Sequence, residues 1–262
     1  MYEYEGLQDV VFIALYCVAA FAALVAAVYL LWRRGNAFMQ EKGPESVKTI
    51  KTPSGAMRVP QPVRSSLRLR RWTAALMLAI VGSHVWWYAL GQIWLTDDRL
   101  VRNIIAIALD HVTLVPLTMA VLLAMLQDRH RPLWPWLVAE VSAVVVTAVM
   151  GIAGRDEFWG YDMLGYCQLA LIAGFIIYYA LALRHYGRWL HDNYADLEHK
   201  EVLQSLLFAV ILFVVYAVYT SNMGEMAREY LSQVISIVII GFLVWRVETL
   251  QELKPFDDED TA

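Results

Sequence analysis

The amino-acid sequence predicts an all-α membrane protein, a bundle of seven transmembrane helices forming a single domain over residues 1–262. Hydrophobic residues make up 59% of the chain and charged residues only 18%, whereas a soluble domain carries roughly a quarter of charged residues. The charged residues are clustered, which leaves seven long apolar stretches between them. Each stretch approaches the length of about 20 residues that a helix needs to cross the hydrocarbon core of a bilayer.

Helices are expected in these stretches rather than strands of a closed barrel. Few of the stretches alternate in polarity, and a helix satisfies its backbone hydrogen bonds within one segment. The third stretch contains Asp110 and His111, and the fourth is short. The predicted spans are about 10–32, 73–95, 103–126, 134–152, 163–184, 203–221 and 229–247.

The basic residues predict the orientation of the bundle, because cytoplasmic loops retain Lys and Arg. An N-terminus outside the cytoplasm and a cytoplasmic C-terminus place 17 of the 21 Lys and Arg residues on the inside. Tryptophans near the predicted span ends agree with these boundaries, since their amphipathic rings prefer the interface. The four basic residues left outside are Arg99, Arg102, Arg155 and Arg228.

Two cytoplasmic segments lie outside the predicted spans. Residues 33–71 form a long basic loop whose glycines and prolines discourage regular structure. Its end, Arg64–Arg71, is rich in arginine and can lie against anionic lipid head groups. Residues 248–262 form an acidic tail.

Ionisable side chains inside the predicted spans are candidate functional residues, because each costs several kcal/mol in hydrocarbon unless it is paired or faces a wet cavity. We expect a polar cluster near the outer leaflet, with Asp110 anchoring a cationic or hydrogen-bonding ligand group and an external arginine as its counter-ion. Aromatic side chains would supply contact area. A purely structural role, as hydrogen bonds between helices, is the competing interpretation. The candidate ligand-binding residues are His84, Tyr88, Asp110, His111 and Tyr166.

Three other features of the spans bear on function. Pro116 interrupts the backbone hydrogen bonds of the third span and is a candidate hinge. Glu140 lies in the inner half of the fourth span, where it can snorkel or carry a proton. The two cysteines, Cys17 and Cys167, both lie in apolar stretches, so no disulfide framework is expected.

Several functions of seven-helix proteins need residues that this sequence lacks. A retinal-binding protein needs a lysine within the last span, and all five lysines are predicted to be cytoplasmic. Membrane zinc hydrolases carry a His-x-x-x-His pair in the last span, and no histidine follows His199. A metal on His84, Asp110 and His111, or a haem between the two histidines, stays open as an alternative. No cofactor is predicted, and the first interpretation is not an enzyme.

The loop between the fifth and sixth spans has the sequence RWLHDNYADLEHKEV, from Arg188 to Val202. Charges of opposite sign at i, i+4 spacing, such as Asp196 and Lys200, predict an amphipathic helix that extends the sixth span into the cytoplasm. Its charged side chains are candidates for a cytoplasmic relay, namely Asp192, Asp196, Glu198 and Lys200.

Three segments, Arg188–Val202, Asp110–Pro116 and Leu243–Leu250, resemble the multi-helix membrane domain of bacterial AraC-type transcription regulators. The resemblance covers the membrane region at the level of topology and implies a sensor in the bacterial cytoplasmic (inner) membrane. The family's helix-turn-helix module is expected after the seventh helix, but the acidic tail carries none and would repel DNA. The chain is therefore expected to be either the sensor half of a longer protein or a stand-alone relative that signals through a partner.

The first functional hypothesis is a receptor-like sensor that relays an external or membrane-borne signal to a cytoplasmic output of transcription regulation. Its expected partners are lipid, an unknown small molecule and a cytoplasmic output domain or protein, with a second copy of the chain also possible and no direct contact with nucleic acid. The second hypothesis is a metal- or haem-binding membrane enzyme or redox protein. The third is a structural subunit of a membrane complex.

Overall fold

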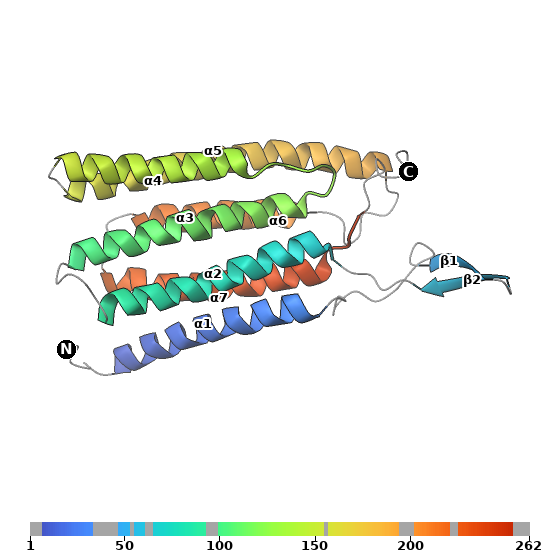
Figure 1. Cartoon of the computed structure of the whole chain (residues 1–262), viewed down its shortest axis with the longest axis horizontal. Helices are drawn as coiled ribbons and strands as arrows, with labels where there is room; N and C mark the ends of the chain where they lie inside the picture. Colours follow the sequence, from blue (N-terminus) through green and yellow to red (C-terminus); the bar gives the residue numbers. More distant parts are fainter. Residues whose placement is uncertain are drawn as a thin grey trace.

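The computed structural model describes residues 7–33, 47–52, 55–60, 65–92, 99–154, 157–193, 202–220 and 225–253. Within these residues the chain forms seven helices that run side by side and one two-stranded hairpin (Figure 1). The elements are α1 Leu7–Trp32, β1 Val47–Thr52, β2 Gly55–Pro60, α2 Leu67–Gln92, α3 Arg99–Met125, α4 Trp134–Gly154, α5 Glu157–Asn193, α6 Leu203–Thr220 and α7 Glu225–Thr249.

Five of the helices are long and apolar enough to cross a membrane over described residues, namely α1, α2, α3, α5 and α7. The apolar parts of α4 and α6 that could be assessed are shorter, Trp134–Thr147 and Leu203–Val218. Large apolar side chains also cover the outside of the bundle, for example Phe21 at 68% and Leu207 at 62% exposure. An apolar exterior of this kind matches lipid rather than water. The chain therefore has the fold and surface of a helical membrane protein.

A helix lies at each of the seven predicted apolar stretches, but two helices extend well beyond their stretch. Helix α2 begins at Leu67 instead of residue 73 and takes in part of the basic segment. Helix α5 continues to Asn193 instead of ending near residue 184. Residues 188–193 thus extend the fifth helix, which corrects the prediction that they extend the sixth. The reason is that the buried stripe of α5 continues through Leu183, Tyr186 and Leu190.

The hairpin of β1 and β2 is a second correction, because little regular structure is predicted for the loop of residues 33–71. The two strands pair antiparallel, with Val47 opposite Pro60 and Thr52 opposite Gly55. Val, Ile and Thr fill four of the six positions of β1, and these β-branched residues favour extended backbone. In Figure 1 the hairpin lies beyond the end of the bundle at which α1 ends.

The helices divide into two groups. Helices α1, α2, α3 and α7 are packed against one another, and α4, α5 and α6 form the second group. Helix α3 makes the main connection, because it contacts both α4 and α5. In the first group α1 presents a stripe of small residues, Ala19, Ala23 and Ala27, all fully buried. Small residues at this spacing let helix backbones approach closely within a membrane.

Candidate functional site

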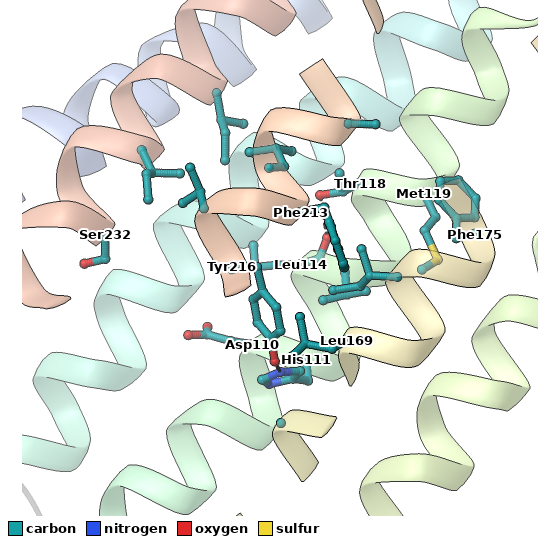
Figure 2. A pocket seen from close by; sticks show the side chains of 18 of the residues that line it. Asp110, His111, Leu114, Thr118, Met119, Leu169, Phe175, Phe213, Tyr216 and Ser232 are labelled. Atoms are coloured by element: carbon teal, nitrogen blue, oxygen red, sulfur yellow. Dashed lines mark hydrogen bonds between the residues drawn. The ribbon is translucent and has the colours of Figure 1, made fainter. Parts of the chain in front are cut away.

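A cavity of about 400 Å³ lies between the two helix groups. Helices α3 and α7 supply one side and α5 and α6 the other, and Trp87 of α2 reaches its wall. Most of the lining is aliphatic or aromatic, as the side chains of Leu114, Leu169 and Phe213 in Figure 2 illustrate. Its polar groups are few and come from Trp87, Asp110, His111, Thr118, Tyr166, Tyr216, Ser232 and Ser236.

Asp110 is held by donors from one face of α2. The indole Nε1 of Trp87 donates to Oδ2 at 2.8 Å, and that of Trp86 donates to Oδ1 at 3.1 Å. Ser83 makes a further hydrogen bond to the same carboxylate. Positions 83, 86 and 87 are three and four residues apart, so a single helical face presents all three donors. The carboxyl group therefore receives several neutral hydrogen bonds while it lines the cavity.

His111 joins α3 to α6 at the cavity wall. Its Nδ1 lies 2.7 Å from the carbonyl oxygen of Ile107, and its Nε2 lies 2.9 Å from the hydroxyl of Tyr216. A carbonyl can only accept, so Nδ1 carries the hydrogen, and a neutral ring then accepts at Nε2 from the tyrosine hydroxyl. Figure 2 shows the ring of Tyr216 directed at His111. This bond connects the two helix groups across one end of the cavity.

His84 belongs to a different cluster. Its ring nitrogens lie 2.7 Å from the carbonyl oxygen of Ile80 and 2.9 Å from Oε1 of Gln233 on α7. The hydroxyl of Tyr16 on α1 donates to the backbone carbonyl of His84, and the two rings meet edge to face. The hydrogen bonds of His84 thus tie α1, α2 and α7 together, whereas those of Asp110 tie α2 to α3.

The two tyrosines of the predicted cluster are exposed. Tyr88 has 63% of its surface exposed, and Tyr166 has 71% exposed although it also contributes to the cavity lining. Of the five candidate residues, the structure therefore brings Asp110, His111 and Tyr166 to one cavity. His84 lies within the first helix group, and Tyr88 lies on its exterior.

The remaining candidates are placed as follows. Pro116 is buried within α3, between cavity-lining residues Val115 and Thr118. Asp192 is exposed near the end of α5. The other proposed relay residues, Asp196, Glu198 and Lys200, lie outside the described residues, as do the side chains of the external arginines.

The geometry gives the metal and haem alternatives no support. Within the described part of the chain, no three His, Cys, Asp or Glu side chains lie close enough to hold a metal ion. The rings of His84 and His111 bond to different helices, α7 and α6, and only His111 lines the cavity.

Sequence reasoning missed the partners of these polar residues. Trp86 and Trp87 are ordinary span tryptophans in the sequence, and Tyr216 and Gln233 are isolated polar positions in apolar helices. The one available signal was that an aspartate within a span needs donors. It does not say which of the neighbouring helices supplies them.

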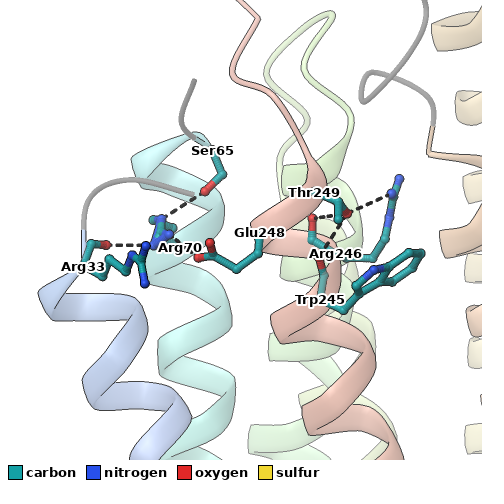
Figure 3. A network of polar contacts seen from close by, with 7 residues as sticks. All are labelled: Arg33, Ser65, Arg70, Trp245, Arg246, Glu248 and Thr249. Carbon is teal, nitrogen blue, oxygen red and sulfur yellow. Dashed lines mark hydrogen bonds and ion pairs between the residues drawn. The ribbon is translucent and has the colours of Figure 1, made fainter. Parts of the chain in front are cut away.

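A polar junction lies at the end of the bundle where α1 ends and α2 begins (Figure 3). Arg70 of α2 is 2% exposed and forms an ion pair with Glu248 of α7, which is 1% exposed. The same guanidinium donates to the carbonyl oxygen of Arg33 at 2.7 Å and to Oγ of Ser65 at 2.9 Å. One buried arginine therefore connects the end of α1, the start of α2 and the end of α7.

The same end of the bundle holds the backbone that follows α7. The side-chain Nε2 of Gln127, just after α3, donates to the carbonyl oxygen of Gln251 at 2.9 Å. Its Oε1 accepts from the backbone N–H of Leu253 at 2.8 Å. These two bonds, here called the Gln127 clamp, hold the backbone that follows α7 against the end of α3. Helices α3 and α7, which line the cavity, are thus joined again at this end.

No protein-family model, curated protein or solved structure matches this chain. The class that the fold and site define is a helical membrane protein with a mainly apolar cavity between its helices. Its distinguishing features are the carboxyl group of Asp110 in the cavity wall and the buried polar junction at one end of the bundle.

Proposed function

We propose that this protein is a membrane-embedded sensor in which a small molecule binds in the cavity and changes the arrangement of the helices at the polar junction. The observation that carries the proposal is that the two helices lining one side of the cavity, α3 and α7, are the two helices joined by the Gln127 clamp. A ligand that displaces either helix also acts on the backbone leaving α7.

The proposed topology has all seven helices in the bilayer, with the polar junction on the cytoplasmic side. The basic residues support this orientation, since the junction end of the bundle carries Arg33, Arg68, Arg70, Arg71 and Arg131. Reporter tags fused to the two ends of the chain test it, because seven spans require opposite compartments for the two tags. Tags in one compartment would rule out an odd number of spans.

The proposed ligand has an apolar body and one cationic group. The lining offers the apolar body contact with leucine, isoleucine and phenylalanine side chains. The carboxyl group of Asp110 has neutral donors from α2, and no described cationic side chain forms an ion pair with it. A carboxylate in this setting interacts more strongly with a cation than with a neutral group.

The proposed output is regulation of transcription through a cytoplasmic partner or attached domain. The resemblance of Arg188–Val202 and of Leu243–Leu250 to the membrane domain of AraC-type regulators supports it. The second of these segments contains Glu248 and leads directly into the Gln127 clamp. The charged end of α5, including Asp192, offers a second surface for such a partner.

Thermal unfolding of the purified protein in detergent tests ligand binding. A long-chain alkylammonium ion is compared with the alcohol and the carboxylate of the same chain length, below the concentration at which each forms micelles. We expect the ammonium ion to raise the unfolding temperature most, because binding to the folded state stabilises it. The control is a variant whose cavity is filled by a larger side chain. If none of the three compounds raises the unfolding temperature of the wild-type protein more than that of this variant, the cavity does not bind such ligands.

A further inference from the structure

A second buried polar site lies away from the cavity, between α4 and α5. The side-chain Nε2 of Gln168 donates to Oε1 of Glu140 at 2.6 Å, and both side chains are 0% exposed. Glu140 lies on the buried face of α4 with Thr147, one heptad further along. Gln168 lies in the buried stripe of α5 between Leu164 and Phe175. Each residue therefore points into the interface of the two helices.

This arrangement leaves two oxygen atoms without a donor. Among the described residues, neither Oε2 of Glu140 nor Oε1 of Gln168 has a hydrogen-bond partner, although both atoms are buried. Each such atom carries the cost of lost solvation, about 1–3 kcal/mol for a neutral group and more for a charged one. Both belong to the same two planar groups that already share one hydrogen bond.

A single proton satisfies both oxygen atoms. A protonated carboxyl group donates from one oxygen and accepts at the other, which is the reverse of what a primary amide offers through its oxygen and nitrogen. We propose that Glu140 and Gln168 form a proton-binding site, in which Glu140 holds the proton on Oε2 and donates it to Oε1 of Gln168. The two side chains are then joined by two parallel hydrogen bonds, and no charge is buried between α4 and α5.

The surroundings favour a proton over a metal cation. Calcium takes six to eight oxygen ligands and magnesium about six, whereas the described side chains offer two free oxygens here. No described side chain forms an ion pair with Glu140. Among the described titratable side chains of α3 and α5, Asp110 bonds to α2, His111 to Tyr216 and Tyr179 to Ser205. Tyr178 packs against the ring of Trp136, Tyr166 is exposed, and Cys167 is a half-buried free thiol.

Loss of the proton changes the contact from two hydrogen bonds to one and places a carboxylate oxygen beside the amide oxygen. These two acceptors repel each other, and a charge then lies buried without a counter-ion. The interface of α4 and α5 is therefore held most firmly when the site is protonated. Since α5 also lines the cavity, the site connects proton binding to the helix group on that side.

Infrared spectroscopy tests the protonation directly. The carbonyl stretch of a protonated carboxylic acid is separate from the bands of a carboxylate, and it shifts in D₂O. At mildly acidic pH, where the carboxyl group of a free glutamate is already ionised, we expect this band in the wild-type protein and its loss in Glu140→Gln. The control Ser142→Ala, at an exposed position of α4, should retain it. Absence of the band in the wild-type protein overturns the proposal.

The pH dependence of unfolding provides a second test that does not need the band. The unfolded chain releases the proton above about pH 4.3, while the folded protein keeps it. Between about pH 4.3 and the pH at which the folded protein also loses the proton, the unfolding constant of the wild-type protein should therefore rise about tenfold per pH unit relative to that of Glu140→Gln, whose amide replaces the protonated acid. Equal pH profiles overturn the proposal. Stabilisation of the wild-type protein, but not of Glu140→Gln, by added Na⁺ assigns the oxygens to a metal cation instead.

Discussion

Arg70, near the start of α2, forms a buried ion pair with Glu248, near the end of α7, across 178 positions of sequence. The same guanidinium also donates hydrogen bonds to the carbonyl oxygen of Arg33 and to the hydroxyl of Ser65, so the protein solvates its charge well. Such a pair is costly to break on one side, because the remaining charge stays buried. It fixes how the ends of three helices meet.

Removing one member of this pair should destabilise the protein strongly. We expect Glu248→Leu to lower the free energy of unfolding by about 3–5 kcal/mol, because Arg70 is left buried without its counter-ion. The double variant Arg70→Met/Glu248→Leu should recover most of that loss. Denaturation in detergent measures both. The exposed Arg68→Met is the control and should change stability by less than about 0.5 kcal/mol. A mild effect of the single variant would show that the pair is solvated from outside.

The carboxyl group of Asp110 should determine the preference for a cationic ligand. In Asp110→Asn we expect the affinity for an alkylammonium ion to fall about 10- to 100-fold, as for loss of a hydrogen bond to a charged group. Membrane insertion should be unchanged, and affinity for the matching alcohol should change little. Titration of the purified proteins measures this. Tyr88→Phe, on the exposed side of α2, serves as the control. Equal losses for ammonium and alcohol would argue against a role of the charge.

Filling the cavity should block ligand binding without unfolding the protein. Leu169 lies on the cavity wall, and its replacement by Trp occupies the space that a ligand needs. We expect Leu169→Trp to lose ligand-dependent stabilisation. Leu181→Trp adds the same side chain to the same helix at a position that is 64% exposed, and it should behave like the wild-type protein. Binding that survives in Leu169→Trp would place the ligand elsewhere.

The bond between Tyr216 and His111 should make only a small contribution to stability. Hydrogen bonds between membrane helices contribute about 0.6 kcal/mol on average, because the separated helices find other partners. We therefore expect Tyr216→Phe to reduce the free energy of unfolding by about that amount. A double-mutant cycle with His111→Phe isolates the coupling between the two side chains. A coupling near zero would mean that the contact does not hold α3 to α6.

The Gln127 clamp should control the order of the backbone after α7. In Gln127→Ala the N–H of Leu253 loses its acceptor, so we expect faster hydrogen exchange at Leu253 and a loss of about 1 kcal/mol in stability. Gln251→Ala is a matched control, because the clamp uses only the backbone carbonyl of Gln251. Unchanged exchange at Leu253 would show that α7 alone orders this segment.

The apolar stretches were sufficient to locate the helices, since the length of an uncharged segment is a property of sequence alone. The ends of the helices and their contacts were harder to predict. Arg70 falls in a basic run for which contact with lipid head groups is predicted, yet it is buried, because its partner Glu248 comes from a distant part of the chain. Asp110 could be identified as a candidate from its charge, but its donors could not, since Trp86 and Trp87 look the same as tryptophans that anchor at an interface. Contacts between helices depend on rotation and pairing, which periodicity does not determine.

The division of the helices into two groups has a mechanical consequence. The group of α1, α2, α3 and α7 contains both the Arg70–Glu248 pair and the Gln127 clamp, whereas α4, α5 and α6 reach it mainly through α3. We expect a displacement of one group relative to the other to act on the contacts between them, namely those of α3, the His111–Tyr216 bond and the stacked rings of Phe208 and Phe242, while the internal bonds of each group remain. Such a displacement changes the space around Asp110, because the cavity lies between the two groups. Helix α3 lines the cavity and contacts helices of both groups, so a change at the cavity reaches both groups through it.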